Sequence, residues 1–510
     1  MTDASASPTP HADPLRIAVI GSGPAGFYTA GHLLGAPSER FTVDMFERLP
    51  TPWGLVRSGV APDHPKIKSV TRVYEKTAAH PRFRFFGNIT FGHHISRADL
   101  LAHYHAIVYA TGSPADRPLG IPGEDLPGSH AATEFVGWYN GHPDHTDLEV
   151  DLLSSERALI VGNGNVALDV ARMLVLAPAE LAPTDTADHA LDVLAHSRVR
   201  EVIVAGRRGP AQAAFTNPEL RELADLAEAD IVVDPDELES ALAVADPDAA
   251  EDTTSRRNVD ILRSYAATPP AGRPRRIVLR FLLSPTALLP GDSGHLGAVE
   301  LVRNRLVPAP GGGLRAQPTG EHETIPCGLV FRAIGYRGIP LPDVPFDARA
   351  GTIPNSSGRV LDPASGHPLP GEYVVGWIKR GPSGVIGTNK KDAQQTVDAI
   401  FADLLSGSTR VADAPPDAAR DRSATDGALG SAIDGSPDAP PDTVHVPDTP
   451  DPAAIETLLR ERQPDLVTYS GWESIDRHER SLGEPAGRPR VKLTTIDDLL
   501  RVAASEHPDP

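Results

Sequence analysis

Two glycine-rich fingerprints are the residues of this chain best suited to chemistry. One occupies residues 21–26 (GSGPAG) directly after the apolar run 17–20, and the other occupies residues 162–167 (GNGNVA) directly after 158–161. In a strand–turn–helix unit, such a turn brings the backbone close to a pyrophosphate, which the free N–H groups of the helix start can bind. One motif is a weak signal, whereas two predict two nucleotide sites and electron transfer between two cofactors.

The first fingerprint has the full set of features that a dinucleotide site needs. Gly21 permits the tight turn, Gly23 allows close approach to the pyrophosphate, and Gly26 lets the helix pack on the strand. A second strand is expected at 41–46 and ends in Glu47, 21 positions beyond Gly26, where a carboxylate can accept hydrogen bonds from ribose hydroxyls. The alternative is a glycine-rich turn that binds no ligand.

The second fingerprint is followed by arginines where an acidic residue would be expected. The next strand, predicted at 201–205, leads into Gly206, Arg207 and Arg208. Two guanidinium groups would attract a 2′-phosphate, so the site is predicted to take NADP(H) in preference to NAD(H). Arg207 lies 45 residues after Gly162, so residues 176–198 are expected to form an extended helix or an insertion. The alternative is a solvated basic pair at the end of a strand.

Composition narrows the chemistry further. The chain has 510 residues, enough for two or three domains, and a net charge of −20, which argues against nucleic-acid binding. Its one cysteine, Cys327, excludes an intrachain disulfide, a Cys-x-x-Cys pair and a cysteine-ligated cluster, so redox chemistry requires bound cofactors. No apolar run is long enough for a membrane helix, and residues 1–14 have no features of a secretion or transit signal, so a cytoplasmic protein is expected.

The residues between and beyond the fingerprints resemble a known family. Residues 50–68 (PTPWGLVRSGVAPDHPKIK), 162–171, 206–223 and 372–394 are similar to the ferredoxin–NADP reductases of the adrenodoxin-reductase type, in particular their actinobacterial members. The resemblance covers about 15–405 and 453–503. It implies an FAD site at the first fingerprint, an NADP(H) site at the second, and no metal.

The expected fold is α/β, with two Rossmann-like dinucleotide-binding domains and a C-terminal helical segment. The FAD-binding domain, 15–112 and 330–408, is interrupted by an inserted NADP-binding domain, 113–329. Outside them we expect a disordered leader (1–14), a disordered Asp/Pro-rich linker (409–452) and a C-terminal helical extension (453–510).

The resemblance also assigns roles to individual residues. Those predicted to bind FAD are Gly21, Gly23, Ala25, Gly26, Glu47, Leu55, Phe91, Trp377, Gly384, Val385 and Ile386. Those predicted to bind NADP(H) are Arg117, Asn163, Gly164, Asn165, Val166, Arg207, Arg208 and Glu219. A helix starting near Thr388 would direct its positive end at the flavin. His64 and Glu222 resemble the family's active-site pair, although Glu219 and Glu222, three residues apart, would otherwise indicate a solvated helix face.

The implied activity is electron transfer from NADPH through FAD to a ferredoxin, by hydride transfer and then single-electron steps. Because the chain and many ferredoxins are both acidic, docking would need a basic patch, and the candidates are Arg256, Arg257, Arg263, Arg273, Arg275 and Arg276. Ordinary solvated loop arginines are the alternative. Two other functions stay open: an electron-input subunit of a glutamate-synthase-like complex, and a non-catalytic nucleotide-sensing module. The first normally carries a cysteine-rich cluster domain, and the second has no need of FAD.

Overall fold

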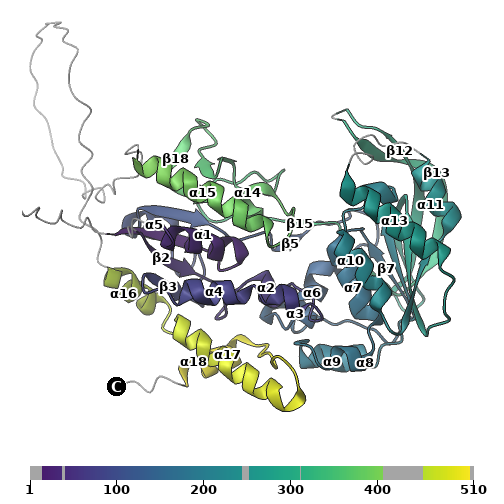
Figure 1. Ribbon diagram of the computed structural model, residues 1–510, viewed down its shortest axis with the longest axis horizontal. Helices are drawn as coiled ribbons and strands as arrows, with labels where there is room; N and C mark the ends of the chain where they lie inside the picture. Colours follow the sequence, from purple (N-terminus) through teal and green to yellow (C-terminus); the bar gives the residue numbers. More distant parts are fainter. Residues whose placement is uncertain (1–13, 37–40, 244–251, 311, 406–451, 506–510) are drawn as a thin grey trace, which may run out of the picture.

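The computed structural model describes residues 14–36, 41–243, 252–310, 312–405 and 452–505. The leader and the linker expected from the sequence lie outside these residues, except for Pro14 and Pro452. Two α/β units lie end to end along the long axis of the molecule (Figure 1). No helix in the described ranges is both long and apolar enough to cross a membrane.

The first unit is built on a seven-stranded sheet with the order β16-β17-β18-β4-β1-β2-β3. Strands β18, β4, β1, β2 and β3 run parallel, and their Val, Ile and Phe side chains are buried on both faces. The strands are β1 (Leu15–Ile20), β2 (Phe41–Phe46), β3 (Phe83–Phe86), β4 (Ala106–Tyr109), β16 (Asn355–Ser356), β17 (Arg359–Leu361) and β18 (Pro368–Val374). The helices are α1 (Pro24–Leu34), α2 (Leu55–Ser58), α3 (Pro65–Lys68), α4 (Thr71–Ala78), α5 (Arg97–His103), α14 (Trp377–Arg380) and α15 (Thr388–Leu405).

The second unit contains a six-stranded parallel sheet with the order β6-β14-β7-β8-β10-β9. Its strands are β6 (Ser129–Ala131), β7 (Arg157–Val161), β8 (Glu201–Gly206), β9 (Ala229–Val233), β10 (Arg275–Phe281) and β14 (Leu329–Arg332). The helices are α6 (Ala132–Tyr139), α7 (Asn165–Val175), α8 (Pro178–Leu181), α9 (Asp188–Ala195), α10 (Asn217–Glu222), α11 (Pro235–Leu242) and α13 (Thr253–Ala267). A three-stranded antiparallel sheet of β11 (Leu283–Pro290), β12 (Leu296–Pro308) and β13 (Leu314–Pro326) packs beside it.

A short antiparallel ribbon connects the units. β5 (Ala115–Asp116) pairs with β15 (Tyr336–Arg337), so the chain leaves and re-enters the first unit side by side. The domain boundary predicted at residue 330 falls inside β14, a strand that pairs with β7 of the second unit. The prediction is therefore wrong at this point, and the boundary lies beyond Arg332. An apolar run such as 329–331 fits a parallel sheet equally well in either unit, which is why the sequence misplaced it. The expected insertion at 176–198 is α8 and α9.

The C-terminal segment folds back as three helices, α16 (Pro452–Arg462), α17 (Tyr469–Gly483) and α18 (Ile496–Ala504). They lie along the first unit, and α17 reaches toward α9 of the second unit (Figure 1). The indole of Trp472 packs edge-on against that of Trp53, with ring centroids 4.8 Å apart. The C-terminal helices therefore cover the loop between β2 and α3.

Buried charges reinforce this packing. The carboxylate of Glu479 on α17 has no exposed side-chain surface and accepts hydrogen bonds from both terminal nitrogens of Arg57 at 2.8 and 2.5 Å. It also accepts from Arg490 at 3.1 Å and from the backbone N–H of Leu493 at 2.9 Å. These partners hold the pKa of Glu479 below its usual value despite burial, which opposes ionisation. The ion cluster joins the C-terminal segment to α2.

A second buried cluster joins the C-terminal segment to both units. Asp185 of the second unit pairs with Lys68 of α3 at 2.7 Å and with Lys492 of the C-terminal segment at 3.2 Å. Both lysines also donate to the side-chain oxygen of Asn140, at 3.3 and 3.2 Å. Burial lowers the pKa of each lysine, whereas the two cations lower the pKa of Asp185. Three segments distant in sequence thus share one buried ionic contact.

The substitution Glu479→Gln should destabilise the protein strongly, since it leaves Arg57 and Arg490 buried beside an uncharged side chain. We expect the free energy of unfolding to fall by about 3–5 kcal/mol, measured by urea denaturation of the FAD-loaded protein. Glu473→Gln, at an exposed position of the same helix, is the matched control and should change stability by less than about 0.5 kcal/mol. Equal stability of the two variants would contradict the assignment.

Candidate active site

The first fingerprint forms the turn between β1 and α1. Gly21 has a φ of +107°, and a Cβ atom there would lie 2.6 Å from the carbonyl oxygen of Ala110. A Cβ on Gly26 would overlap the carbonyl oxygen of Gly21, so both glycines are required by the packing of the protein itself. A Cβ on Gly23 would meet nothing within 4 Å. Gly23 therefore faces open space at the start of α1, as a pyrophosphate site requires.

Glu47 lies beside this turn, at the end of β2. Its carboxylate accepts hydrogen bonds from the Ser22 N–H at 3.1 Å, from the Ser22 hydroxyl at 2.6 Å and from the Leu49 N–H at 3.1 Å. The acidic residue thus holds the fingerprint turn in place, at the position where the sequence predicted a ribose contact. That contact itself stays a prediction.

The segment predicted to surround the flavin packs against the first fingerprint. A Cβ on Gly376 would lie 2.6 Å from the Cβ of Ala25, and α15 packs along α1. Trp377 begins α14, and Gly384, with a φ of +80°, lies four residues before the start of α15 at Thr388. Helix α15 thus begins where the sequence predicted a helix near the flavin.

The lining of this region suits a large ring system with polar edges. Leu55 is 39% exposed and Val385 is 54% exposed, which is high for apolar side chains. Three buried polar atoms, Thr111 Oγ1, Ser113 Oγ and Trp377 Nε1, have no hydrogen-bond partner among the described residues. FAD offers a flat apolar ring and many polar atoms, so these residues fit it.

For two other residues predicted at the FAD site, Phe91 and Ile386, the structure shows only packing against the core of the first unit. Phe91 is partly buried against the core of the first unit and lies edge-on to Tyr109, with ring centroids 6.0 Å apart. Ile386 is partly buried against the core on the α1 side of the sheet. No described contact joins Phe91 to the fingerprint turn, so its role stays a prediction.

The second fingerprint turn, between β7 and α7, is held by the loop that leads to α10. The carbonyl of Asn163 accepts from the Ala214 N–H at 2.9 Å, and the side-chain oxygen of Asn165 accepts from the Thr216 N–H at 2.8 Å. The side-chain nitrogen of Asn163 is buried without a partner among the described residues. Gly164 and Val166 are half-buried at the start of α7. The turn can therefore offer N–H donors to a pyrophosphate.

Arg207 and Arg208 follow β8, the neighbour of β7 in the sheet. Their backbone carbonyls accept hydrogen bonds from Asn304 Nδ2 at 3.0 Å and the Leu282 N–H at 3.1 Å, which fixes the loop. Neither guanidinium has a hydrogen bond or ion pair within the described ranges. The exposed Arg117 donates from Nε to the carbonyl of Tyr336 at 3.3 Å, on the ribbon between the units. The guanidinium groups of Arg207 and Arg208 are therefore available to a phosphate.

The predicted active-site pair is in direct contact. His64, directly before α3 of the first unit, is 7% exposed, and its Nε2 lies 2.8 Å from a carboxylate oxygen of Glu222 on α10 of the second unit. Glu219 lies on the same side of α10, 3.9 Å from the same nitrogen. The two glutamates therefore do not form a purely solvated face. The cluster therefore lies at the contact between the two units.

A buried arginine lies at the centre of this cluster and offsets part of its negative charge. Arg172 on α7 is 2% exposed, and its guanidinium pairs with Asp63 at 2.8 Å, Asp169 at 3.1 Å, Glu219 at 3.4 Å and Glu222 at 3.5 Å. The imidazole and the two glutamates could together hold a metal ion, since their ligand atoms lie within 4.8 Å of one another. The Arg172 guanidinium would compete with a metal ion for the carboxylates of Glu219 and Glu222. The geometry therefore favours an ion pair with Arg172 over a bound metal ion.

Burial changes the ionisation of the acids in this cluster. Burial raises the pKa of Asp169 to about 7, although the neighbouring Arg172 acts in the opposite direction. Burial also raises the pKa of Glu219, against the influence of His64 and Arg172. The phenol of Tyr336, which lies near Asp169, has its pKa raised mainly by burial as well. Perturbed acids grouped at one place are typical of functional sites.

The sequence analysis missed Asp63, Asp169, Arg172 and Tyr336. A signal was present for two of them: Asp169 and Arg172 interrupt the otherwise apolar helix that follows the second fingerprint. Charged residues on the buried side of a helix are rarely fully buried unless they are paired. Their partners could not be read from the chain, because Asp63 lies 109 residues before Arg172.

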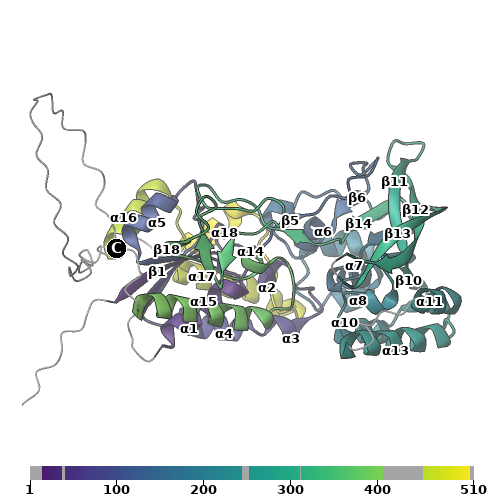
Figure 2. The ribbon, with the colours of Figure 1, turned by 90° about the horizontal axis from the view of Figure 1, so that it is seen from above.

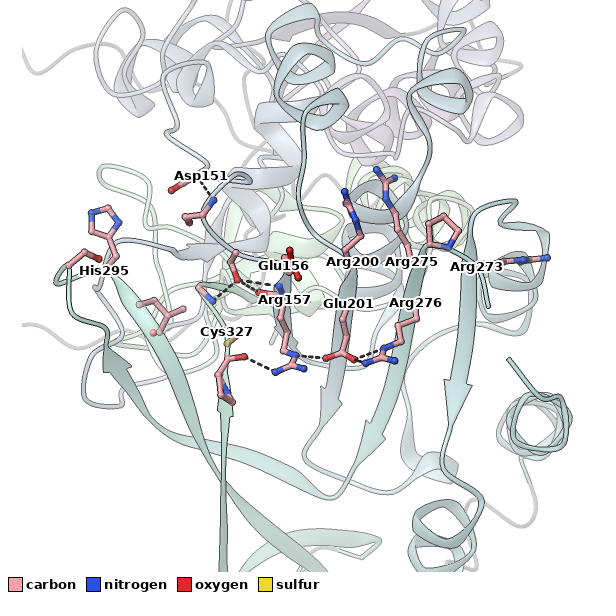
Figure 3. A pocket seen from close by; sticks show the side chains of 18 residues that line it. Asp151, Glu156, Arg157, Arg200, Glu201, Arg273, Arg275, Arg276, His295 and Cys327 are labelled. Carbon is pink, nitrogen blue, oxygen red and sulfur yellow. Dashed lines mark hydrogen bonds and ion pairs between the residues drawn. The ribbon is translucent and has the colours of Figure 1, made fainter. Parts of the chain in front are cut away.

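A second groove lies away from this site. A groove of about 830 Å³ lies where β7, β8 and β10 begin, at the sheet edge opposite the second fingerprint (Figure 3). Its arginines are already bonded: Arg157 and Arg276 pair with Glu201, and Arg275 donates to the carbonyls of Val175 and Leu176 at 3.0 and 2.7 Å. Cys327 lies in its wall, where burial raises the pKa of the thiol to about 12.

Comparisons with known proteins agree with this arrangement. Residues 15–204 match the family described as pyridine nucleotide-disulphide oxidoreductase. The chain is 48% identical over 494 residues to NADPH-ferredoxin reductase FprA of Mycobacterium tuberculosis, covering 96% of this chain and 99% of the relative. It is 40% identical to the mitochondrial NADPH:adrenodoxin oxidoreductase of Arabidopsis thaliana, covering 96% of each. The solved structure of the M. tuberculosis protein in complex with NADPH superimposes with a TM-score of 0.83 at 47% identity, covering 96% and 100% of the two chains.

The raised pKa of Asp169 predicts a pH-dependent stability. The folded protein keeps a proton on Asp169 up to about pH 7, whereas the unfolded chain releases it near pH 4, so this stabilisation is full below pH 4 and is lost as the pH rises through 7. Asp169→Asn cannot lose that proton. The stability of the wild type relative to this variant should therefore fall by up to about 4 kcal/mol between pH 4 and pH 8.

The measurement is urea unfolding of the FAD-loaded proteins at pH 4, 5, 6, 7 and 8. Asp225→Asn, at an exposed position on the segment after α10, is the control and should follow the wild type at every pH. Parallel curves for the wild type and Asp169→Asn would show that Asp169 keeps an ordinary pKa.

Proposed function

The chain belongs to the NADPH-ferredoxin reductase family, and from this premise we propose that it passes electrons from NADPH through FAD to an iron–sulfur protein of the ferredoxin class. It is an FAD-dependent oxidoreductase with the two-unit fold of that family. The observation that carries the proposal is the 2.8 Å contact between His64 of the first unit and Glu222 of the second, next to two dinucleotide turns. When bound, FAD accepts a hydride from NADPH and releases the electrons one at a time.

The residues of the chain bind and orient the two cofactors. We assign the first turn, with Glu47, to FAD, together with Leu55, Trp377 and the segment 384–386. We assign the second turn to the pyrophosphate of NADP(H), Arg207 and Arg208 to its 2′-phosphate, and Arg117 to a phosphate. The unpaired guanidinium groups of Arg207 and Arg208 support this assignment, because a planar fork of donors matches a phosphate.

His64, Glu219 and Glu222 act by positioning and by charge. Hydride transfer needs no general acid or base, so these residues are expected to tune rate and binding. The Arg172 guanidinium lies 3.4 and 3.5 Å from the carboxylates of Glu219 and Glu222 and offsets part of their negative charge. Glu219, on the buried side, is assigned to the nicotinamide end.

Two competing chemistries lack the residues they need. A disulfide reductase requires a reactive cysteine pair, and the one cysteine of this chain is buried with a raised pKa. The cluster domain of a glutamate-synthase-like subunit also requires several cysteines. The pyridine nucleotide-disulphide family match therefore supports the fold and cofactors, without disulfide chemistry. We retain the cytoplasm as the proposed location.

The acceptor needs a basic surface near the reacting site, and the six candidate arginines separate into three groups. Arg273, Arg275 and Arg276 line the remote groove and are already bonded to carbonyls or to Glu201 (Figure 3). Arg263 is exposed but paired with Glu239 at 2.8 Å. We therefore retain Arg256 and Arg257 as the docking patch, because both are exposed and neither forms an ion pair with an acid in the described ranges.

The place of Arg256 and Arg257 supports a docking role. Both lie in the first turns of α13, next to the start of α10. Asn217 of α10 donates to the carbonyl of Thr254 at 3.0 Å and to the side chain of Asn258 at 2.7 Å. These hydrogen bonds hold the part of α13 that carries the two arginines against α10, the helix that carries Glu222.

Replacing Arg207 and Arg208 by Gln tests the cofactor assignment. The KM for NADPH should rise about tenfold or more, since charge-assisted phosphate contacts are lost, while the KM for NADH should barely change. Stopped-flow reduction of the bound flavin by NADPH and by NADH is the measurement. A wild-type protein that prefers NADH would show the assignment to be wrong.

Replacing Arg256 and Arg257 by Glu tests the docking patch. Reduction of a ferredoxin should slow by about tenfold at low ionic strength, because electrostatic steering is reversed. Reduction of ferricyanide by NADPH should stay unchanged, since it needs no protein docking. Equal loss in both assays, or an unchanged ferredoxin rate, would count against the patch.

A further inference from the structure

Helices α3 and α4 expose a face of mixed basic and apolar character. Lys66, Arg72 and Lys76 are exposed on it. Ile67 and Val73 lie among them, 39% and 51% exposed, and both are among the most exposed large apolar side chains of the described residues. We call these five residues the α3–α4 face. Cations on such a face would attract an acidic partner, and the aliphatic side chains would be removed from water on contact.

The internal packing of the protein does not account for this face. Tyr74 and Ala78, on the other side of α4, pack toward α1, with the rings of Tyr74 and Phe27 stacked at 4.9 Å. Within the described ranges, no ion pair or hydrogen bond uses the side chain of Lys66, Arg72 or Lys76. Arg72 and Lys76 stand four residues apart on one helix, an arrangement of like charges that disfavours the helix.

Charge contrast makes the face unusual for this chain. The protein has a net charge of −20. Residues 66–76 nevertheless carry three exposed cations and one acid, Glu75, in addition to Lys68, which is paired with Asp185. Glu75 faces away toward α17, 3.8 Å from Arg480. The face therefore presents positive potential to an approaching molecule, while most of the chain is acidic.

The face lies next to the reacting site. His64 directly precedes α3, and its ring contacts Glu222 of α10. Figures 1 and 2 show α4 and α3 on the same side of the molecule as α10 and α13. The α3–α4 face and the arginines of α13 thus flank the contact between the two units.

We propose that the α3–α4 face is the first unit's half of the docking surface for the electron acceptor, an acidic iron–sulfur protein. The inference rests on the proposed function and names a surface that it did not include. An acceptor seated here and on α13 would be held from both units, beside the junction where the electrons become available. A second copy of this acidic chain is disfavoured as the occupant, because the face would gain no opposite charge from an identical face.

The double substitution Arg72→Glu/Lys76→Glu tests the proposal without changing any residue assigned to cofactor binding. The probe is an acidic [2Fe–2S] ferredoxin, reduced by the FAD-loaded protein with NADPH. We expect kcat/KM for this ferredoxin to fall about tenfold at low ionic strength and to approach the wild-type value in high salt, where surface charges are screened. NADPH-dependent ferricyanide reduction should stay at the wild-type rate.

Arg305→Glu/Arg315→Glu is the matched control, because it makes the same charge change at exposed positions of β12 and β13, in the second unit. It should leave ferredoxin kinetics nearly unchanged. An equal loss in the control would assign the effect to net charge and overturn the proposal. Val73→Gln keeps all charges and should raise the KM for ferredoxin without altering its salt dependence. It provides a second test of the face if the double variant folds poorly.

The remaining outcomes separate this inference from the proposed function. If the wild type reduces ferredoxin and the α4 variants do so equally well, the docking surface lies elsewhere. If the wild type reduces ferricyanide but no ferredoxin, the proposed function itself fails. Size-exclusion chromatography accompanies the kinetics, since a changed oligomeric state with unchanged ferredoxin kinetics would assign the face to a second copy of the chain.

Discussion

A single buried guanidinium organises the reacting region of this protein. Arg172 pairs with four carboxylates, of which Asp63 comes from the first unit and the others from the second. A guanidinium that is 2% exposed is tolerated only when its charge is fully paired, so these partners are constrained to stay together. The ion cluster thus ties the two units together beside the contact of His64 with Glu222. His64 and Glu222 take their relative position from it.

The connection between the units depends on more than this cluster. Only the β5–β15 ribbon joins them through sheet hydrogen bonds in the described residues, and it has two residues on each side. So short a ribbon cannot set the angle between two sheets. The buried contacts of Asp185 with Lys68 and Lys492, and of Glu479 with Arg57, supply further fixed points, and they draw the C-terminal segment into the core of the enzyme. The relative position of the two units therefore depends on residues far from either fingerprint.

Much of the secondary structure was predictable, because the periodicity of apolar residues and the residues that bound each element are local features of the sequence. The strands at 41–46 and 201–205 are confirmed within one residue at each end, and the helix predicted to start near Thr388 begins at that residue. Each is bounded by glycine or charge and has the periodicity of its type. The strand at 329–332 was predictable as a strand, yet not as a member of the second sheet, because pairing in a parallel sheet carries no local signature.

The sequence by itself determined the two nucleotide turns, the acid after the first, the arginines after the second, and the exclusion of thiol chemistry by a lone cysteine. These depend on backbone geometry and residue type within a few positions. The tertiary structure alone decided which buried charges meet: Lys68 and Asp185 are 117 residues apart, and Asp63 and Arg172 are 109 apart. It also separated the arginines beside α10 from those in the remote groove. Such contacts follow from how two sheets pack against each other, which no short stretch of sequence specifies.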